Sequence, residues 1–208
     1  TALSVMRMAF ANDGYQKKFK GHVSDAITDI SDVIDRTLMA DKFDSAQIEV
    51  RKEFIDLPEL LKEQAAIGGV TVTSPDFFVF YSDPNLLRRI LVNLIDNAKK
   101  YGHDDFPVSV ALSEATIDGL QCAQIMIENR ISTVGFPDPQ QVFEKYYRAP
   151  HAHSRTGSGL GLYLVKHLAE ILGGRVEYRA LTEHVVFVLT FPMTAEANVV
   201  RHSIRGTA

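Results

Sequence analysis

The sequence predicts an α+β protein in which a helical hairpin precedes a two-layer sandwich of a mixed sheet and three helices. Two patterns lead to this prediction. Apolar residues between positions 15 and 43 recur at alternating steps of four and three, which is the heptad pattern of a coiled coil or helix bundle. From about Ala46, strand-like runs alternate with helical ones. We therefore expect a hairpin over residues 1–44, a second domain over 45–193 and a polar tail over 194–208.

The first part of the chain is predicted to form two antiparallel helices. Residues 1–11 have the apolar spacing of a helix, and Asn12-Asp13-Gly14 has the composition of a tight turn. The seam of the second helix consists of Phe19, Val23, Ala26, Ile30 and Val33, widened by Ile27, Ile34 and Leu38. A hairpin of this size buries little apolar surface alone. We therefore expect a homodimer, in which two hairpins complete a four-helix bundle.

The second domain is predicted to mix strands with helices. A strand over 48–55 precedes a helix over 57–67 begun by Pro58, and strands at 70–72 and 77–80 follow. Asp83-Pro84 then has the N-cap and first-turn residues of a long helix that runs to Gly102. Strands at 108–112 and 121–127 flank an Asp118-Gly119 turn, and a loop region fills 130–157. A helix ending at Gly173-Gly174 and a hairpin over 175–191 complete the domain.

Composition excludes several classes of protein. Of the 208 residues, 46% are hydrophobic and 23% charged, which is ordinary for a soluble globular protein. The net charge of −4 argues against a nucleic-acid partner. The one cysteine, Cys122, excludes an intrachain disulfide, suits the cytosol and is expected to be a buried apolar residue. No apolar run is long enough to span a membrane. Because the chain starts at Thr1, we expect it to be a piece of a longer protein, with any membrane anchor outside it.

A glycine-rich segment near the C-terminal end is the most informative motif. It reads Gly157-Ser158-Gly159-Leu160-Gly161-Leu162, and a helical apolar pattern follows it. Glycine permits positive φ and a close approach of ligand to backbone. A helix N-terminus adds unpaired N–H groups and a partial positive charge. The segment is therefore suited to binding phosphate.

A polar helix face supplies the matching half of such a site. Asn93 and Asn97 lie four residues apart, and Lys100 follows at the next turn, so all three share one face. Amide oxygens and an ammonium suit a Mg²⁺–phosphate group, because Mg²⁺ takes oxygen ligands and leaves positions for phosphates. In isolation such a segment is more often a solvated polar helix face. The glycine-rich segment downstream favours the binding interpretation.

These two motifs resemble those of sensor histidine kinases, and the resemblance covers nearly the whole chain. The first part is similar to the end of the family's dimerisation hairpin, and the rest is similar to its ATP-binding domain, which has the Bergerat or GHKL-type fold. Residues 83–101 look like the family's N box, 143–148 its F box and 157–162 its G2 box. The resemblance implies ATP and Mg²⁺ as ligands, with Asn97 on the metal and Asn93 and Lys100 on phosphates. It further implies nucleotide contacts from Tyr101, Arg148, Gly157, Gly159, Leu160, Gly161 and Leu162, and possible phosphate contact from Arg155.

The sequence departs from the family where an aspartate usually accepts a hydrogen bond from the adenine amine. Counting back from Phe143 places Asn129 at that position. The amide oxygen of an asparagine can still accept this bond, and its NH₂ could also donate to a guanine carbonyl, which would relax base choice. Only Gly135 remains near the family's paired glycines, so we expect this loop to approach the nucleotide less closely and the affinity to be low. Glu128 is a second candidate, although strand alternation places it on the opposite face.

The phosphoacceptor histidine is the second departure. His22 lacks the acidic residue and proline of the family's H box, so we expect it to be solvated and the acceptor to lie upstream of Thr1. His151 and His153 are expected to be exposed residues of a lid over the nucleotide. They are too few to form a metal site, because structural zinc normally has four ligands.

The resemblance implies a protein-histidine kinase that transfers the γ-phosphoryl of Mg-ATP to a histidine, for relay to an aspartate of a response-regulator receiver domain. It places the fragment in the cytoplasm and the full-length protein in the bacterial inner membrane. Two alternatives remain. A weak or inactive nucleotide-binding dimer scaffold fits the altered residues around Asn129. An ATPase clamp of the same fold fits less well, because Asn93 stands where such enzymes place a glutamate base, and a carboxamide cannot take a proton.

Overall fold

A computed structural model describes residues 30, 33–34, 36–41, 43, 48–66, 69–131, 135–150 and 157–193 of the chain. Its main element is a five-stranded sheet with strand order β2-β4-β5-β7-β6. The strands are β2 (Val70–Thr73), β4 (Val108–Ile117), β5 (Leu120–Arg130), β6 (Arg175–Ala180) and β7 (His184–Pro192). β2 pairs with β4 in parallel and the other pairs are antiparallel, so the predicted mixed sheet is confirmed.

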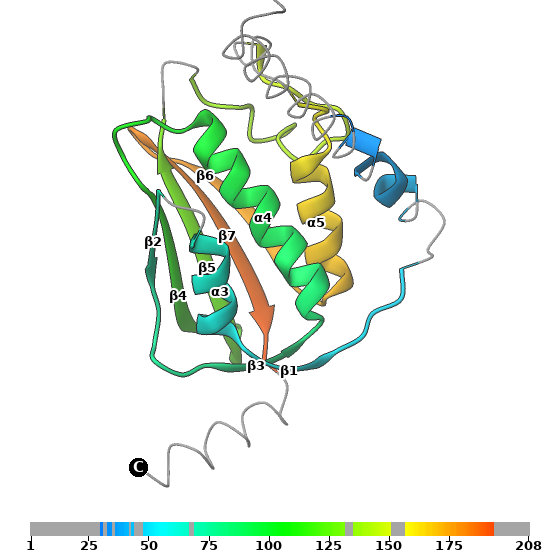
Figure 1. Cartoon of the computed structure of the whole chain (residues 1–208), viewed down its shortest axis with the longest axis vertical. Helices are drawn as coiled ribbons and strands as arrows, with labels where there is room; N and C mark the ends of the chain where they lie inside the picture. Colours follow the sequence, from blue (N-terminus) through cyan, green and yellow to red (C-terminus); the bar gives the residue numbers. More distant parts are fainter. Residues whose placement is uncertain are drawn as a thin grey trace, which may run out of the picture.

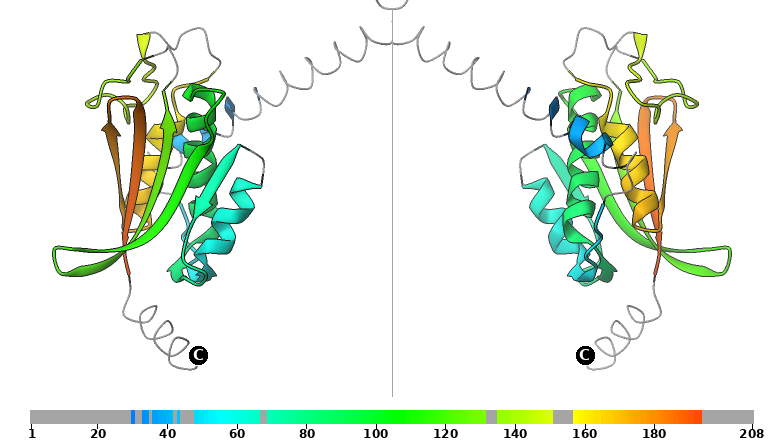
Figure 2. Two further views of the ribbon diagram at one scale, coloured as in Figure 1. Left: turned by 90° about the vertical axis from the view of Figure 1, so that its left-hand side faces the viewer. Right: turned by 90° about the vertical axis from the view of Figure 1, so that its right-hand side faces the viewer.

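Three helices lie on one face of this sheet and form the second layer (Figures 1 and 2). They are α3 (Leu57–Ala65), α4 (Pro84–Tyr101) and α5 (Gly161–Ile171). A separate two-stranded sheet joins β1 (Glu53–Asp56) to β3 (Val79–Ser82). The predicted α+β sandwich of a mixed sheet and three helices is therefore confirmed for the second domain.

Several predicted element boundaries need correction. The strand expected from residue 48 begins only at Glu53, and the strand expected from residue 77 begins at Val79, because β1 and β3 pair over just four residues. In contrast, β4 and β5 are longer than predicted, since they pair continuously from Ser109–Glu128 to the tight turn. That turn is at Asp118 and Gly119, both at positive φ, as the sequence indicated.

Local chemistry explains both ends of α4, the central helix. The Asp83 carboxylate accepts hydrogen bonds from the backbone N–H groups of Asn85 and Leu86, at 2.9 and 3.0 Å, and Pro84 occupies the first turn. At the other end the N–H of Gly102 donates to the Ala98 oxygen, and a Cβ on Gly102 would lie only 2.5 Å from that oxygen. Gly102 therefore ends the helix, and its bridge to Ile131 fixes this end beside β5.

The core fills the space between helices and sheet. On α4 the apolar residues recur at helical spacing and are fully buried: Leu87, Ile90, Leu91 and Leu94. They pack in one cluster with alternate residues of the strands, among them Ile125, Ile127, Leu189 and Phe191. Burying one such side chain stabilises the fold by roughly 1.5–3 kcal/mol. Cys122 is buried and free, as predicted. This packing holds α4 and α5 side by side, which is what positions the site.

The described residues before position 44 are helical and rest on α5 (Figure 1). We call residues 30, 33–34, 36–41 and 43 the N-terminal helix segment. Ala40 is fully buried against Leu160 and Leu164, and the ring centroid of Phe43 lies 5.5 Å from that of His167. The seam residues Ile30, Val33, Ile34 and Leu38 are exposed. The rest of the predicted hairpin and the tail over 194–208 lie outside the described residues. Within the described residues, the helices are too short or too polar to cross a membrane.

Candidate functional site

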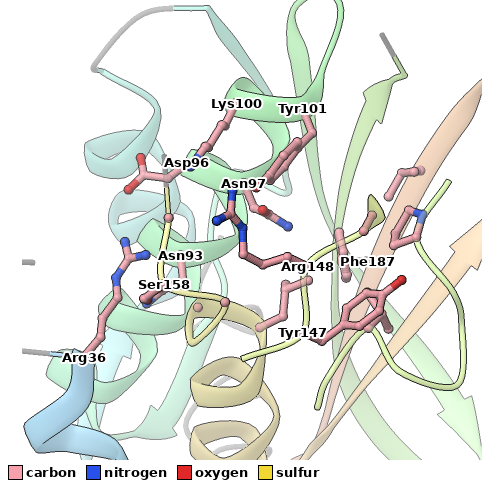
Figure 3. Close-up of a pocket in the computed structure, with 18 of the residues that line it drawn as sticks. Arg36, Asn93, Asp96, Asn97, Lys100, Tyr101, Tyr147, Arg148, Ser158 and Phe187 are labelled. Atoms are coloured by element: carbon pink, nitrogen blue, oxygen red, sulfur yellow. The ribbon is translucent and has the colours of Figure 1, made fainter. Parts of the chain in front are cut away.

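A cavity of about 570 Å³ lies between α4, the start of α5 and one end of β5 and β7. Its walls bring together most of the residues singled out in the sequence (Figure 3). These are Asn93, Asn97, Lys100, Tyr101, Asn129, Arg148, Gly157, Gly159, Gly161 and Leu162. Residues 69 positions apart along the chain, such as Asn93 and Leu162, therefore share one site.

The polar face of α4 forms one wall of the cavity. Asn93, Asn97 and Lys100 project from successive turns and span about 10 Å along the helix axis. The amide nitrogen of Asn93 donates to the Arg89 carbonyl oxygen over 2.8 Å. Its Oδ1 is buried and accepts no hydrogen bond from any described residue. A buried acceptor without a partner suits a ligand-bound cation or its water shell, so the residues present fit a Mg²⁺–phosphate group.

The glycine-rich segment passes directly across this wall. A Cβ on Gly157 would lie 2.8 Å from the Lys100 ammonium, and one on Gly161 would lie 3.1 Å from Asn93 Oδ1. Gly157 and Gly159 also have φ of +148° and +72°, which other residues rarely adopt. Glycine is therefore required here for conformation and for space, and its N–H groups remain close to the polar face of α4.

The side chain of Leu160 does not supply the predicted nucleotide contact. It does not line the cavity, and instead it is buried with Ala40 and Leu164 in a small apolar cluster. The reason is geometric: Leu160 is the residue before the first turn of α5, and its side chain points to the face that contacts the N-terminal helix segment.

The opposite end of the cavity is apolar, with one buried amide. Asn129 is 5% exposed, and its side-chain nitrogen donates to the Arg130 carbonyl oxygen over 3.3 Å. This bond uses one of the two amide hydrogens, so the amide of Asn129 keeps one donor and its acceptor oxygen for a ligand. Glu128 does not line the cavity; its carboxylate lies 4.0 Å from His184, so the alternation that placed it on the other face of β5 is confirmed.

The segment before the glycine-rich loop closes the apolar end. Tyr147 lines the cavity, and its hydroxyl accepts a hydrogen bond from the Asp138 N–H at 2.9 Å. Behind it, the Tyr178 hydroxyl donates to the Pro137 oxygen over 3.4 Å. Burial, with a smaller effect from Tyr147, raises the pKa of Tyr178 to about 12. The Tyr178 hydroxyl is therefore uncharged at neutral pH.

Sequence reasoning missed several lining residues. Arg36 reaches the cavity from the N-terminal helix segment, and Asp96 from the edge of α4 (Figure 3). Ile131, Val142, Tyr147, Val185 and Phe187 form much of the apolar end. The strand alternation of Val185 and Phe187 indicated that both side chains are buried, but it did not indicate that they line this cavity. Nothing local indicated Arg36, because its position depends on how the segment packs on α5.

Some predicted residues lie outside the described part of the chain. They are His22, His151, His153 and Arg155. Among the residues that are described, no group of three or more histidines, cysteines or carboxylates is arranged to hold a metal ion.

A mixed sheet covered by helices on one face, with a polar helix wall opposite a glycine-rich helix start, defines a nucleotide-binding domain of the GHKL class. The sequence family described as histidine kinase-, DNA gyrase B-, and HSP90-like ATPase matches residues 82–195, more than half of the chain. The chain therefore belongs to this family, and its named relatives are sensor histidine kinases.

Individual comparisons agree with this assignment. The chain is 27% identical over 188 residues to the sensor histidine kinase HprS of Escherichia coli, covering 86% of this chain but only 40% of HprS. The fold is similar to the histidine kinase AdeS of Acinetobacter baumannii, with a TM-score of 0.63, 16% identity and coverage of 93% and 96% of the two chains. It is also similar to full-length ShkA, solved with AMPPNP, with a TM-score of 0.66, 21% identity and coverage of 86% and 39%.

Proposed function

We propose that the chain binds ATP with Mg²⁺ in this cavity and transfers the γ-phosphoryl group to a histidine of the dimerisation hairpin. The phosphoryl group then passes to an aspartate of a response-regulator receiver domain. The observation that carries the proposal is the convergence of the α4 polar face, the glycine-rich segment and buried Asn129 on one cavity. The complex of the related fold ShkA with AMPPNP, an ATP analogue, is consistent with it.

The polar end of the cavity is where the triphosphate would lie. Asn97 is the proposed metal ligand, and Asn93 and Lys100 contact the phosphates or the waters of the metal. The N–H groups around Gly157, Gly159 and Gly161 would donate to phosphate oxygens. When bound at Asn97, Mg²⁺ would neutralise part of the phosphate charge. Arg148 and Lys100 add positive charge from the protein on two sides.

The apolar end is where the base would lie. Tyr101 would pack beside it, and Asn129 Oδ1 would accept a hydrogen bond from the exocyclic amine of adenine. The Asn129 nitrogen donates one of its two hydrogens to the Arg130 oxygen, and the second hydrogen could still donate to a guanine carbonyl. The relaxed base choice that the sequence indicated therefore stays a prediction, which the comparison of ATP with GTP tests.

The proposed reaction is an in-line displacement in which the protein positions and neutralises its reactants. A lone pair of the acceptor imidazole forms the new N–P bond. The bond between the γ-phosphorus and the β–γ bridging oxygen breaks, and ADP leaves with that electron pair. Asn93 and Lys100 are the residues proposed to contact the reacting phosphate. Neither is a base for water, which argues against the ATPase-clamp alternative.

The wider architecture is also a proposal. Residues 1–44 would form the dimerisation hairpin, 45–193 the catalytic domain and 194–208 a tail, and two copies would pair through their N-terminal helices. Since the chain spans less than half of HprS, a sensor, the acceptor histidine and any membrane anchor would be supplied by further segments. The fragment would then lie in the cytoplasm, attached to a bacterial inner-membrane protein.

Calorimetric titration with ATP, ADP and GTP, with and without Mg²⁺, tests the proposal. Asn97→Ala is expected to abolish Mg²⁺-dependent ATP binding. Asn85→Ala is the matched control, because Asn85 is exposed near the start of the same helix and does not line the cavity. If the unsubstituted chain binds no nucleotide at millimolar concentration, the kinase proposal is wrong and a dimeric scaffold without nucleotide takes its place. An ATP affinity that changes neither on removal of Mg²⁺ nor in Asn97→Ala would refute the assignment of Asn97 as the metal ligand.

A further inference from the structure

Arg36 is a cation of the N-terminal helix segment that reaches the nucleotide cavity from outside the catalytic domain (Figure 3). We propose that Arg36 binds the terminal phosphate of a nucleoside triphosphate, and that the cavity thereby distinguishes ATP from ADP. The inference rests on the proposed function, since it presumes that a nucleotide occupies this cavity.

The guanidinium of Arg36 lies over the first residues of α5. One of its terminal nitrogens is 3.7 Å from the Cβ position of Gly161, and the buried oxygen of Asn93 is 3.1 Å from the same point. Arg36, Asn93 and the start of α5 therefore meet at one place. A helix N-terminus, a guanidinium and an amide side chain together are suited to hold a phosphate group and its bound cation.

Nothing in the described structure neutralises this guanidinium. Arg36 is half-buried, and no hydrogen bond or ion pair joins it to another described residue. Asp96 is the one carboxylate among the described lining residues, and it is exposed. Partial burial removes some of the water around the guanidinium, and an anionic partner would offset that cost. An anionic ligand in the cavity would provide that partner.

The position of Arg36 assigns it to one end of the ligand. The base end is marked by Tyr101 and Asn129, since a Cβ on Gly102, the residue after Tyr101, would lie 3.5 Å from the Asn129 side-chain nitrogen. Asn93, beside Arg36, is eight residues before Tyr101 on α4, which is about 12 Å along the axis. A nucleotide with its base at Asn129 would run along α4 past Lys100 and Asn97. Its last phosphate would be the group nearest Arg36.

This contact would also join the two parts of the chain. The segment that carries Arg36 is held on α5 by Ala40, which is fully buried against Leu160 and Leu164. A triphosphate would add a charged contact between catalytic domain and segment, whereas a diphosphate would end before reaching it. The position of the hairpin helix would then depend on whether ATP or ADP is bound.

The test compares ATP, AMPPNP and ADP binding by calorimetry in the unsubstituted chain and three variants, always with Mg²⁺. Arg36→Gln removes the charge, and Arg36→Lys keeps it as a point charge without the planar fork. Arg88→Gln is the matched control, because it also removes one arginine charge. Arg88 lies on α4, is paired with Glu63 and does not line the cavity. Circular dichroism checks that each variant is folded.

We expect Arg36→Gln to weaken ATP and AMPPNP binding at least tenfold and ADP binding less than twofold. Arg36→Lys should have an intermediate ATP affinity, and Arg88→Gln should bind all three nucleotides as the unsubstituted chain does. Equal losses for ATP and ADP, or no loss, would overturn the inference while leaving the proposed function intact. Absence of ATP and ADP binding in the unsubstituted chain would instead refute the proposed function on which the inference rests.

Discussion

The backbone N–H of Tyr146 donates a hydrogen bond to the carbonyl oxygen of Gly159 over 3.1 Å, and both residues have positive φ, of 66° and 72°. A Cβ on Gly159 would lie 2.7 Å from the Tyr146 carbonyl carbon. The turn that carries Tyr147 and Arg148 is thereby fixed to the glycine-rich segment. Two walls of the cavity are held together by backbone atoms alone.

Gly159→Ala is therefore expected to weaken ATP binding at least tenfold, because the added methyl group separates these two walls. The measurement is the dissociation constant of Mg-ATP by calorimetry. Gly173→Ala is the control, since Gly173 also has positive φ but nothing within 4 Å of its Cβ position. The control should lose only stability, by about 1 kcal/mol, with unchanged ATP affinity. Equal effects of both variants on affinity would show that the contact with Tyr146 is unimportant.

Asn129→Leu tests the base-binding end of the cavity. Leucine has a similar size but cannot accept a hydrogen bond, so the adenine amine would be left unpaired in a buried place. We expect ATP affinity to fall about tenfold or more, while competition by inorganic tripolyphosphate stays unchanged because its contacts lie at the other end. A parallel loss of tripolyphosphate binding would mean that the substitution has disturbed the whole cavity.

Ala40→Glu tests whether contact of the N-terminal helix segment with α5 is needed for nucleotide discrimination. A carboxylate at this fully buried position would be driven out to solvent, and the segment with it. Amide hydrogen exchange over residues 36–43 should rise, and the preference for ATP over ADP should fall as in Arg36→Gln. Leu38→Glu adds the same charge at an exposed position of the same segment and should leave that preference unchanged. If Ala40→Glu retains the full preference, Arg36 does not depend on this packing.

Tyr178→Phe tests the partly buried Tyr178 hydroxyl behind Tyr147. In the unfolded chain this hydroxyl ionises near pH 10, whereas in the fold its pKa is raised to about 12. Between these values the unfolded state binds fewer protons, so stability present below pH 10 is lost as the pH rises toward 12. The free energy of unfolding in urea, measured at pH 8, 10 and 11, should fall less steeply for Tyr178→Phe. At neutral pH the variant should lose about 1 kcal/mol or less, from the bond to Pro137. Identical slopes would show that Tyr178 is not buried enough to matter.

Prediction from sequence was most accurate where the residues that limit an element lie within it or directly beside it. The start of α4 follows from the Asp83 side chain and Pro84, and its end from Gly102, all within a few residues of the helix they limit. Strand boundaries were less accurate, because β1 begins where its partner β3 can pair, not where the apolar residues at 48 and 50 begin.

The sequence by itself determined the chemistry of the candidate site: amides and an ammonium on one face of α4, and glycines at the start of α5. These patterns are local, since helix periodicity and glycine conformation operate within a few residues. Only the tertiary structure decided which groups meet. Packing of α4 against α5 sets Asn93 opposite Gly161. Packing of the N-terminal helix segment on α5 buries Leu160 away from the cavity and brings Arg36 to it from far upstream. Such contacts depend on the close fit of three separate elements, which no single stretch of sequence specifies.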